Sequence, residues 1–252
     1  MPGYAVYKGV YRRQRIHGWN PSRSGVSRVR FGPTPLKIYL PSTGAAAVSP
    51  AFDAAWEETG DADRRAMVTT RINSAMTNKS ITLALAAQDA LFRQYVSDTL
   101  AAQTISGAVS IQVRATEALA TADAIARLTL KVVSQDGTTE RATLLAFGDF
   151  GNGTEFDATT LTSNTFAFKD AVTAYTCILG DRLSLELGCN HAAAAVGVSI
   201  NFGDDSSTDL TENDETETTA NNPWLLFYRP VTFQSVAAGL LVGSLRLMGA
   251  GR

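Results

Sequence analysis

The chain has 252 residues, of which 22 are Lys or Arg and 24 are Asp or Glu, for a formal net charge of −2. A hydrophobic content of 45% excludes a wholly disordered protein and allows a sizeable core. Only 18% of the residues are charged, against roughly 25% in an average domain, so we expect a surface rich in neutral side chains. Two cysteines and two histidines are too few for a disulfide framework, a zinc cluster or a His-rich metal site.

The N-terminal segment is strongly basic. Residues 1–37 hold eight Lys or Arg and no acid, whereas the remaining residues have a net charge of −10. Because the segment also holds four prolines and no sustained hydrophobic period, we predict that residues 1–35 form an extended arm rather than a domain. Aromatic residues are interleaved with its arginines, which favours contact with a neighbouring subunit. Nucleic acid is the less favoured partner. The predicted arm anchors are Arg12, Arg13, Arg15, Arg28 and Arg30.

Period-two alternation of apolar and polar residues begins at Leu36 and predicts a strand over residues 36–40. Residues 50–66 form the best candidate for a short helix or turn. The Asp136-Gly137 dipeptide lies between two alternating runs and predicts a tight hairpin turn. Further strands are predicted over residues 66–77, 79–86, 109–116, 127–132, 141–146, 165–169, 183–187, 196–202 and 224–228.

Many short strands separated by Gly- and Asp-rich turns predict an all-β fold. We expect a single antiparallel, jelly-roll-like β-sandwich over residues 36–234. Trp224 is expected in its core. Residues 235–252 are apolar and punctuated by glycine, so they are interpreted either as a last strand or as a tail that docks on another subunit.

The most polar stretch is the acidic loop at residues 203–222, which has seven acids and no base. We interpret it as a solvated loop or as the electrostatic partner of a neighbour's basic arm. A weak calcium site is the alternative, because Ca²⁺ prefers clustered carboxylates, but the loop lacks the ligand order of an EF-hand, so no metal is predicted. The candidate residues are Asp204, Asp205, Asp209, Glu212 and Asp214.

Catalytic motifs have little support. His191 follows a predicted strand and is interpreted as a strand-edge or loop residue rather than a catalytic base. The glycine-rich run at 148–153 lacks the Lys-Ser/Thr ending and the helix of a nucleotide-binding loop. Cys177 and Cys189 lie in apolar runs and are interpreted as buried structural thiols. We therefore predict no enzymatic activity and no cofactor.

Membrane contact and export are not expected. No apolar run reaches the 18 or more residues of a membrane span, and the best candidate, at 236–247, is interrupted by glycines and Arg246. The N-terminus has no apolar segment of the kind that a signal peptide needs. We expect a soluble protein that is made in the cytoplasm.

Four stretches together resemble a widespread group of tailed-bacteriophage structural proteins. They are IYLPSTGAAAVSPAFDAAWE, QYVSDTLAAQTISGAVSIQVRATEA, GDRLSLELG and NNPWLLF, and they span about residues 38–228. The chain departs from the group's pattern at Asp98 and Thr99, where a proline is expected, and in its long basic arm. The resemblance implies a β-sandwich protein of the virion, in the tail or as a decoration of the capsid. It also implies assembly with copies of itself and with other virion proteins, and no enzymatic activity.

A receptor-binding or carbohydrate-binding module on the same scaffold is the alternative. Sandwich lectins bind sugars through exposed aromatic side chains and acidic loops. Trp19 in the arm and the acidic loop would supply these groups here. A glycan is expected as a partner only in this case.

Overall fold

The structure is a computed structural model that describes residues 34–70, 74–83, 87–150, 155–156, 158, 162–192, 196–204 and 223–234. These residues form two β-sheets and one short 3₁₀ helix, η1 (Ala120–Ala122). Since η1 has three residues, the described part of the chain contains no helix that could cross a membrane. The prediction of an all-β fold is confirmed.

The first sheet is organised around one long strand, β5 (Gln103–Glu117). One edge of β5 pairs with β8 (Thr162–Cys177). Its other edge pairs with two strands that follow one another along it, first β11 (Trp224–Phe227) and then β10 (Val196–Asp204). The sheet is completed by β1 (Leu36–Tyr39) beside β11 and β3 (Ser74–Leu83) beside β10, and all these pairs are antiparallel.

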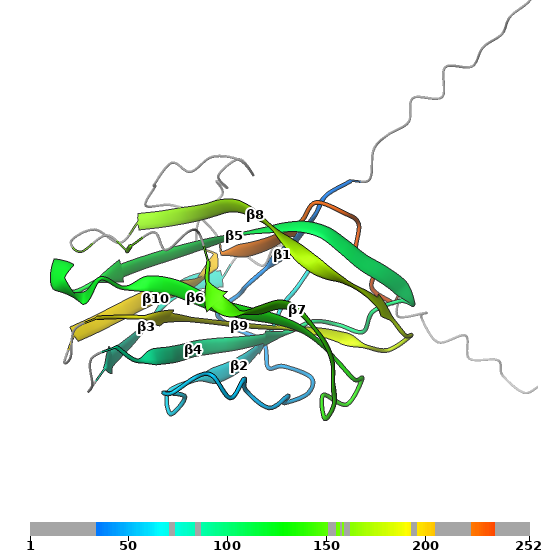
Figure 1. Cartoon of the computed structure of the whole chain (residues 1–252), viewed down its shortest axis with the longest axis horizontal. Coiled ribbons are helices and arrows are strands. Elements are labelled where there is room, and N and C mark those ends of the chain that lie inside the picture. Colours follow the sequence, from blue (N-terminus) through cyan, green and yellow to red (C-terminus); the bar gives the residue numbers. More distant parts are fainter. Residues whose placement is uncertain are drawn as a thin grey trace, which may run out of the picture. The chain divides into compact units, whose positions relative to one another are not determined.

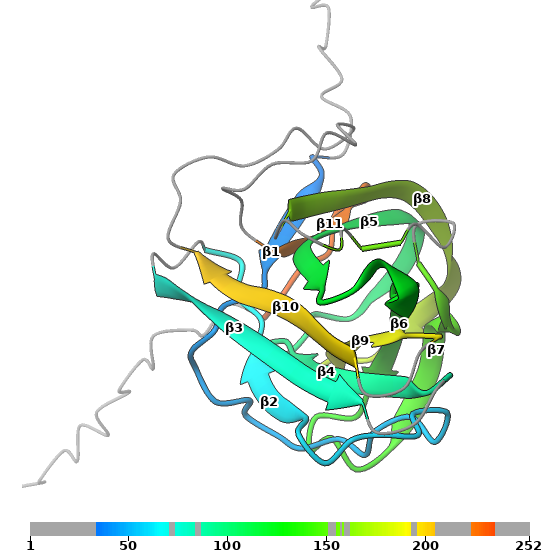
Figure 2. The ribbon, with the colours of Figure 1, turned by 90° about the vertical axis from the view of Figure 1, so that its left-hand side faces the viewer.

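The second sheet has the order β2 (Asp63–Ala66), β4 (Asp89–Val96), β9 (Arg182–Asn190), β6 (Ile125–Val133) and β7 (Glu140–Asp149). The β2–β4 pair is parallel and the other pairs are antiparallel. The predicted antiparallel sandwich is therefore correct apart from this short edge strand. Figures 1 and 2 show β4, β6 and β9 facing the strands around β5 across the core.

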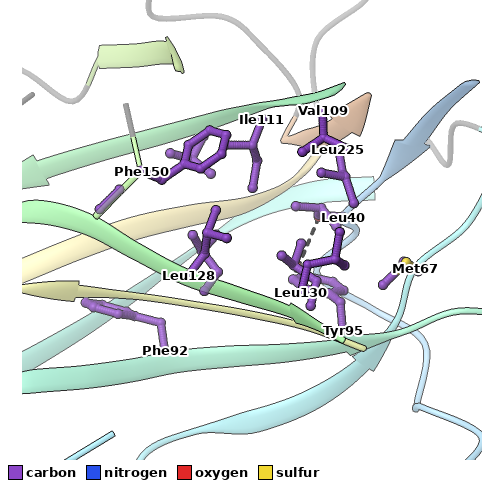
Figure 3. Packing of buried hydrophobic residues seen from close by; sticks show 14 of the residues in the cluster. Leu40, Met67, Phe92, Tyr95, Val109, Ile111, Leu128, Leu130, Phe150 and Leu225 are labelled. Atoms are coloured by element: carbon purple, nitrogen blue, oxygen red, sulfur yellow. Dashed lines mark hydrogen bonds between the residues drawn. The ribbon is translucent and has the colours of Figure 1, made fainter. Parts of the chain in front are cut away.

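The core lies between the two sheets and is built from alternate, inward-facing residues of the long strands. On β5 these residues are Val109, Ile111 and Val113, and on β9 they are Leu183, Leu185 and Leu187. Figure 3 shows Leu128 and Leu130 of β6 packed in the same layer. Full burial of each such side chain contributes about 1.5–3 kcal/mol, so the alternation seen in the sequence accounts for the packing of the two sheets.

The predicted hairpin turn joins β6 and β7. Gly137 has φ +76°, a conformation that L side chains rarely adopt, and its N–H donates to Ser134 O at 2.9 Å. The Asp136 carboxylate accepts bonds from the Ser134 hydroxyl at 2.5 Å and from Thr138 N at 3.1 Å. These bonds, led by that from Ser134, lower the pKa of Asp136 to about 2.

Residues 50–66 contain no helix. Turns at residues 54–55 and 60–61 are followed by β2, so only the turn interpretation of this segment is correct. The two strands predicted at 66–77 and 79–86 correspond, within the described residues, to one strand, β3. Strand β4 was not predicted, because Arg93 and Gln94 interrupt its apolar run, although both are buried in the structure.

Trp224 is buried as predicted, but it does not lie between the sheets. Its neighbour Leu225 pairs with Ile111 and points into the core. Trp224 pairs with Gln112 on β5, so it lies on the opposite, outer face of the sheet. Lys37 of β1 places its ammonium group 4.6 Å from the centre of the Trp224 ring.

Residues 235–252, interpreted as a strand or tail, lie outside the described residues.

Candidate functional site

The two sites predicted from charge lie almost entirely outside the described residues. The arm anchors Arg12, Arg13, Arg15, Arg28 and Arg30 all do. So do the acidic-loop residues Asp205, Asp209, Glu212 and Asp214. Asp204 is the last residue of β10, where a register shift precedes its pairing with Ser74. The structure therefore does not test whether these charges bind a partner.

A buried polar cluster is centred on Glu186 of β9, which is fully buried. Its carboxylate accepts bonds from Trp56 Nε1 at 2.6 Å, Gln94 Nε2 at 2.9 Å and Asp53 N at 3.0 Å. Burial raises the pKa of Glu186, although these donors oppose the change. The carboxylate fastens residues 53–56 to the outer face of the second sheet. We call the group formed by Glu186, Trp56, Gln94 and Asp53 the Glu186 clasp.

Gly188 makes room for the clasp. A Cβ added at Gly188 would lie 2.0 Å from Ala90 O and 2.7 Å from the Trp56 ring, so only glycine fits. The same indole packs edge-on against Phe147, with ring centroids 4.8 Å apart. Trp56 is thereby held by two contacts and one hydrogen bond. It is a structural tryptophan and not an exposed platform for a ligand.

Ion pairs continue the clasp across the second sheet. Lys131 Nζ lies 2.8 Å from Asp53 and 2.9 Å from Glu140. Burial would raise the pKa of Asp53, but the bond from Lys131 and the N–H of Ala55 outweigh it and lower the pKa overall. Arg127 in turn lies 3.1 Å from Asp89 and 2.9 Å from Asp149. These carboxylates are engaged by basic side chains of the same sheet.

Another ion pair, between Arg93 and Asp63, lies at the β2–β4 edge of the second sheet. Arg93 is 3% exposed and donates to both oxygens of Asp63, at 2.6 and 3.0 Å. Its guanidinium group also lies 4.3 Å from the centre of the Phe202 ring on β10 in the opposite sheet. Tyr95 donates its hydroxyl hydrogen towards Leu40 O (Figure 3) and towards Pro41 O. This cluster ties the two sheets together.

A third titratable group lies at the end of the core. Glu117 continues the inward-facing series Val113 and Ala115 on β5, and it is only 1% exposed. Its Oε2 accepts a bond from Ala124 N at 2.7 Å, while Oε1 has no hydrogen-bond donor among the described residues. Burial, followed by the nearby carboxylates of Glu155 and Asp123, raises the pKa of Glu117 to about 7. The sequence signal for this site was the acid at the next inward position of an apolar alternation.

The cysteines and His191 lie where the sequence placed them. Cys177 and Cys189 are both buried and unbridged, and burial raises the pKa of Cys177 to about 11 and that of Cys189 further, so neither is a reactive thiolate at neutral pH. His191 directly follows β9 and is buried. Within the residues described, no three acids, histidines or cysteines are grouped so that they could hold a metal ion.

Large apolar side chains reach solvent at two places in the described chain. Ile178 and Leu179, 56% and 67% exposed, form the tip of the β8–β9 turn, and Leu119, 57% exposed, follows β5. Cys177 pairs with Gln103, the first residue of β5, so the turn and Leu119 lie beyond opposite ends of that strand. A strand of 15 residues spans about 50 Å. The apolar positions are therefore well separated.

The apolar turn is held rigidly. Ile178 N donates to the carboxylate of Asp181 at 3.0 Å, and Gly180 N donates to Leu100 O at 3.0 Å. Leu100 N returns a bond to Asp181 O at 2.6 Å. Beside the turn, the β6–β7 hairpin contributes a hollow of about 490 Å³ lined by Ser134, Gln135, Asp136 and Arg141.

Comparison with known proteins does not assign a family. No family model matches the chain, and no curated protein matches it. Among solved structures, two crystal structures of a CocE/NonD family hydrolase from Staphylococcus aureus have 10% and 11% sequence identity, with TM-scores of 0.25 and 0.26. They cover 80% and 81% of this chain, which spans only 34% and 35% of theirs. A similarity this low carries no argument about function.

Proposed function

We propose that the chain is a non-enzymatic structural subunit of a tailed-phage virion, in the tail or on the capsid surface. It assembles with copies of itself and with other virion proteins. Besides the sequence resemblance, the observation that supports this proposal best is the placement of the exposed apolar residues. Ile178 and Leu179 lie beyond one end of β5 and Leu119 lies beyond the other.

Exposed apolar side chains on a rigid turn suit an assembly contact. Because hydrogen bonds already fix the backbone of Ile178 and Gly180, little conformational freedom is lost when a partner binds. Apolar anchors of this kind contribute most when they enter a desolvated pocket of the partner. Contacts at two opposite ends join subunits head to tail, and such heterologous contacts build rings or filaments rather than closed pairs.

The contacts of the motif residues also support a structural role. Trp56, Gln94 and Glu186 come from three of the four stretches that carry the resemblance, and all three meet in the clasp. In the fourth stretch, Trp224 pairs with Gln112 of the second. These residues of the four stretches thus hold the fold together.

Charge supplies the second part of the proposed assembly. In this proposal the basic arm, through Arg12, Arg13, Arg15, Arg28 and Arg30, contacts carboxylates of a neighbouring subunit. The acidic loop that includes Asp204 and Asp205 is the preferred partner. Ion pairs of this kind weaken as salt rises, which separates them experimentally from the apolar contacts.

The proposal is tested by adding charge to the apolar turn. The mass of the full chain is measured by analytical ultracentrifugation over a range of concentrations, for the wild type and for the double variant Ile178→Asp, Leu179→Asp. Thr173→Asp, which adds a carboxylate to an exposed position of the neighbouring strand β8, is the matched control. We expect the wild type and the control to assemble, and the double variant to remain at 26.8 kDa with an unchanged melting temperature. Equal assembly of all three, or a monomeric wild type, would contradict the proposal.

A further inference from the structure

We propose that Glu117 and Glu155 form a proton-sharing carboxyl pair that fastens residues 155–156 to the start of β6, and that this fastening weakens as pH rises from acid towards neutrality. The pair is independent of the assembly contacts argued above. It is a pH-sensitive device built into one end of the sandwich.

The first argument is the location of the Glu117 side chain. Its carboxyl group lies on the core side of β5, where the preceding inward residues are Val113 and Ala115, and the residue is 1% exposed. An isolated carboxylate in such surroundings is costly, because burial disfavours the charged form. Among the described residues, no Lys or Arg side chain forms an ion pair or hydrogen bond with it, in contrast to the buried Asp181, which lies 3.6 Å from Arg141 Nε.

The second argument is the hydrogen-bonding pattern of the carboxyl group. Oε2 accepts from Ala124 N, whereas Oε1 is buried without a donor. The neighbouring side chain that could supply one is Glu155, itself an acid. A hydrogen bond between two carboxyl groups requires a proton on one of them. The arrangement is therefore satisfied when the pair holds one proton and is left with an unpaired buried oxygen when it holds none.

The third argument is the backbone around the pair. Glu155 forms an isolated antiparallel bridge with Ile125, and Phe156 N donates to Ala124 O at 2.8 Å. Phe156 is buried in the core cluster. Ala124 thus binds Glu117 through its N–H and Phe156 through its carbonyl. Loss of the shared proton places two like charges across this short stretch and loosens residues 155–156.

The charged or titratable groups around Glu117 all belong to this end of the fold. Asp123 precedes β6, Glu155 lies on the facing segment, and Cys189 of β9 interacts electrostatically with Glu117. His191 lies nearby, since Ala192 N, one residue further on, donates to Ala122 O at 2.6 Å. Once Glu117 ionises, the carboxylates of Glu155 and Asp123 both repel it. The pKa of Glu117, raised to about 7, agrees with proton loss near neutral pH.

The proposal is tested by amide hydrogen exchange of the full chain between pH 5.5 and 8.5, corrected for the intrinsic exchange rate and run with a chelator. The matched variant is Glu117→Gln, which is neutral at every pH and keeps both an acceptor for Ala124 N and a donor for Glu155. We expect protection of the Phe156 amide in the wild type to fall as pH rises from 5.5 to about 7, by up to about tenfold per pH unit, the limit for one proton, and then to level off. In Glu117→Gln the same amide should stay protected throughout.

Three further experiments keep the proposal falsifiable. Glu155→Gln should reduce the pH response without abolishing it, because burial still raises the pKa of Glu117, and infrared difference spectra at pH 6 should show a protonated carboxyl signal in the wild type that Glu117→Gln lacks. His191→Gln should retain the response. A Phe156 response that persists in Glu117→Gln, or one that disappears only in His191→Gln, would overturn the assignment to the carboxyl pair.

Discussion

Polar side chains on the outer faces of the two sheets are paired in different ways. The outer face of the second sheet carries charge, and the clasp and ion pairs around Glu186 and Lys131 bury it under residues 53–56. The outer face of the first sheet carries hydroxyls that satisfy one another in pairs. Thr104 pairs with Thr176 at 3.0 Å and Ser80 with Ser199 at 2.6 Å.

The two kinds of pairing differ in how much they contribute to the free energy of unfolding. Removing a partner from the clasp leaves buried donors unsatisfied, and each such group costs about 1–3 kcal/mol. Removing one hydroxyl from an exposed pair leaves the other in contact with water, at little cost. The second sheet therefore concentrates the polar contributions to stability, whereas the exposed hydroxyl pairs of the first sheet tolerate substitution.

The largest effect is expected from Glu186→Ala. The substitution removes the acceptor for Trp56 Nε1, Gln94 Nε2 and Asp53 N at once, and it leaves Lys131 with less compensation. We expect a loss of about 3–5 kcal/mol in the free energy of unfolding, measured by urea denaturation. A loss below that of the sheet-one control Thr176→Ala would break the comparison.

A second large effect is expected from pH. The folded-state pKa of Glu117 is raised to about 7 from an ordinary 4.5, so the folded chain holds a proton that the unfolded chain releases. The stabilisation is fully present below about pH 4.5 and is lost as pH rises to about 7, a change of about 3 kcal/mol. Urea midpoints measured across this range should fall in the wild type relative to Glu117→Gln. Parallel curves for the two proteins would contradict the prediction.

Next in size is Gly188→Ala. A Cβ at this position meets Ala90 O and the Trp56 ring, so either the β4–β9 pairing or the indole must move. We expect a loss of about 1–3 kcal/mol, with a change in Trp fluorescence as Trp56 shifts. Gly148→Ala on β7, where an added Cβ has nothing within 4 Å, is the matched control and should be close to neutral.

The smallest effect is expected from Thr104→Ala on the first sheet. Its hydroxyl partner Thr176 is exposed and can bind water instead. Thermal unfolding should show a change of about 0.5 kcal/mol or less. A loss comparable to that of Glu186→Ala would mean that the first sheet, too, depends on its outer polar contacts.

Elements that show a pattern within one stretch of sequence could be predicted, whereas elements that depend on contacts between distant residues could not. Alternation along one strand predicted β5, β6, β9 and β10, and the Asp136-Gly137 turn fixed the β6–β7 hairpin. Strand β4 escaped because its buried polar residues look like surface residues until their partners are known. Asp63, which pairs with Arg93, is 30 residues away in sequence.

The candidate sites were harder to predict. Glu117 could have been flagged, since it stands at an inward position of a clear alternation. The clasp could not, because Trp56 and Glu186 are 130 residues apart and no local pattern links them. The exposed Ile178 and Leu179 lie in an apolar run that, by composition alone, suggests burial. The arm and the acidic loop remain predictions from charge.

The central claim is that this chain is an assembly subunit, and light scattering at low and high salt tests it most directly. The full chain is compared with a chain that lacks residues 1–35. We predict that the full chain assembles to a mass well above 26.8 kDa at low salt, and that both high salt and the truncation reduce this mass. A mass of 26.8 kDa for both chains in every condition would contradict the account.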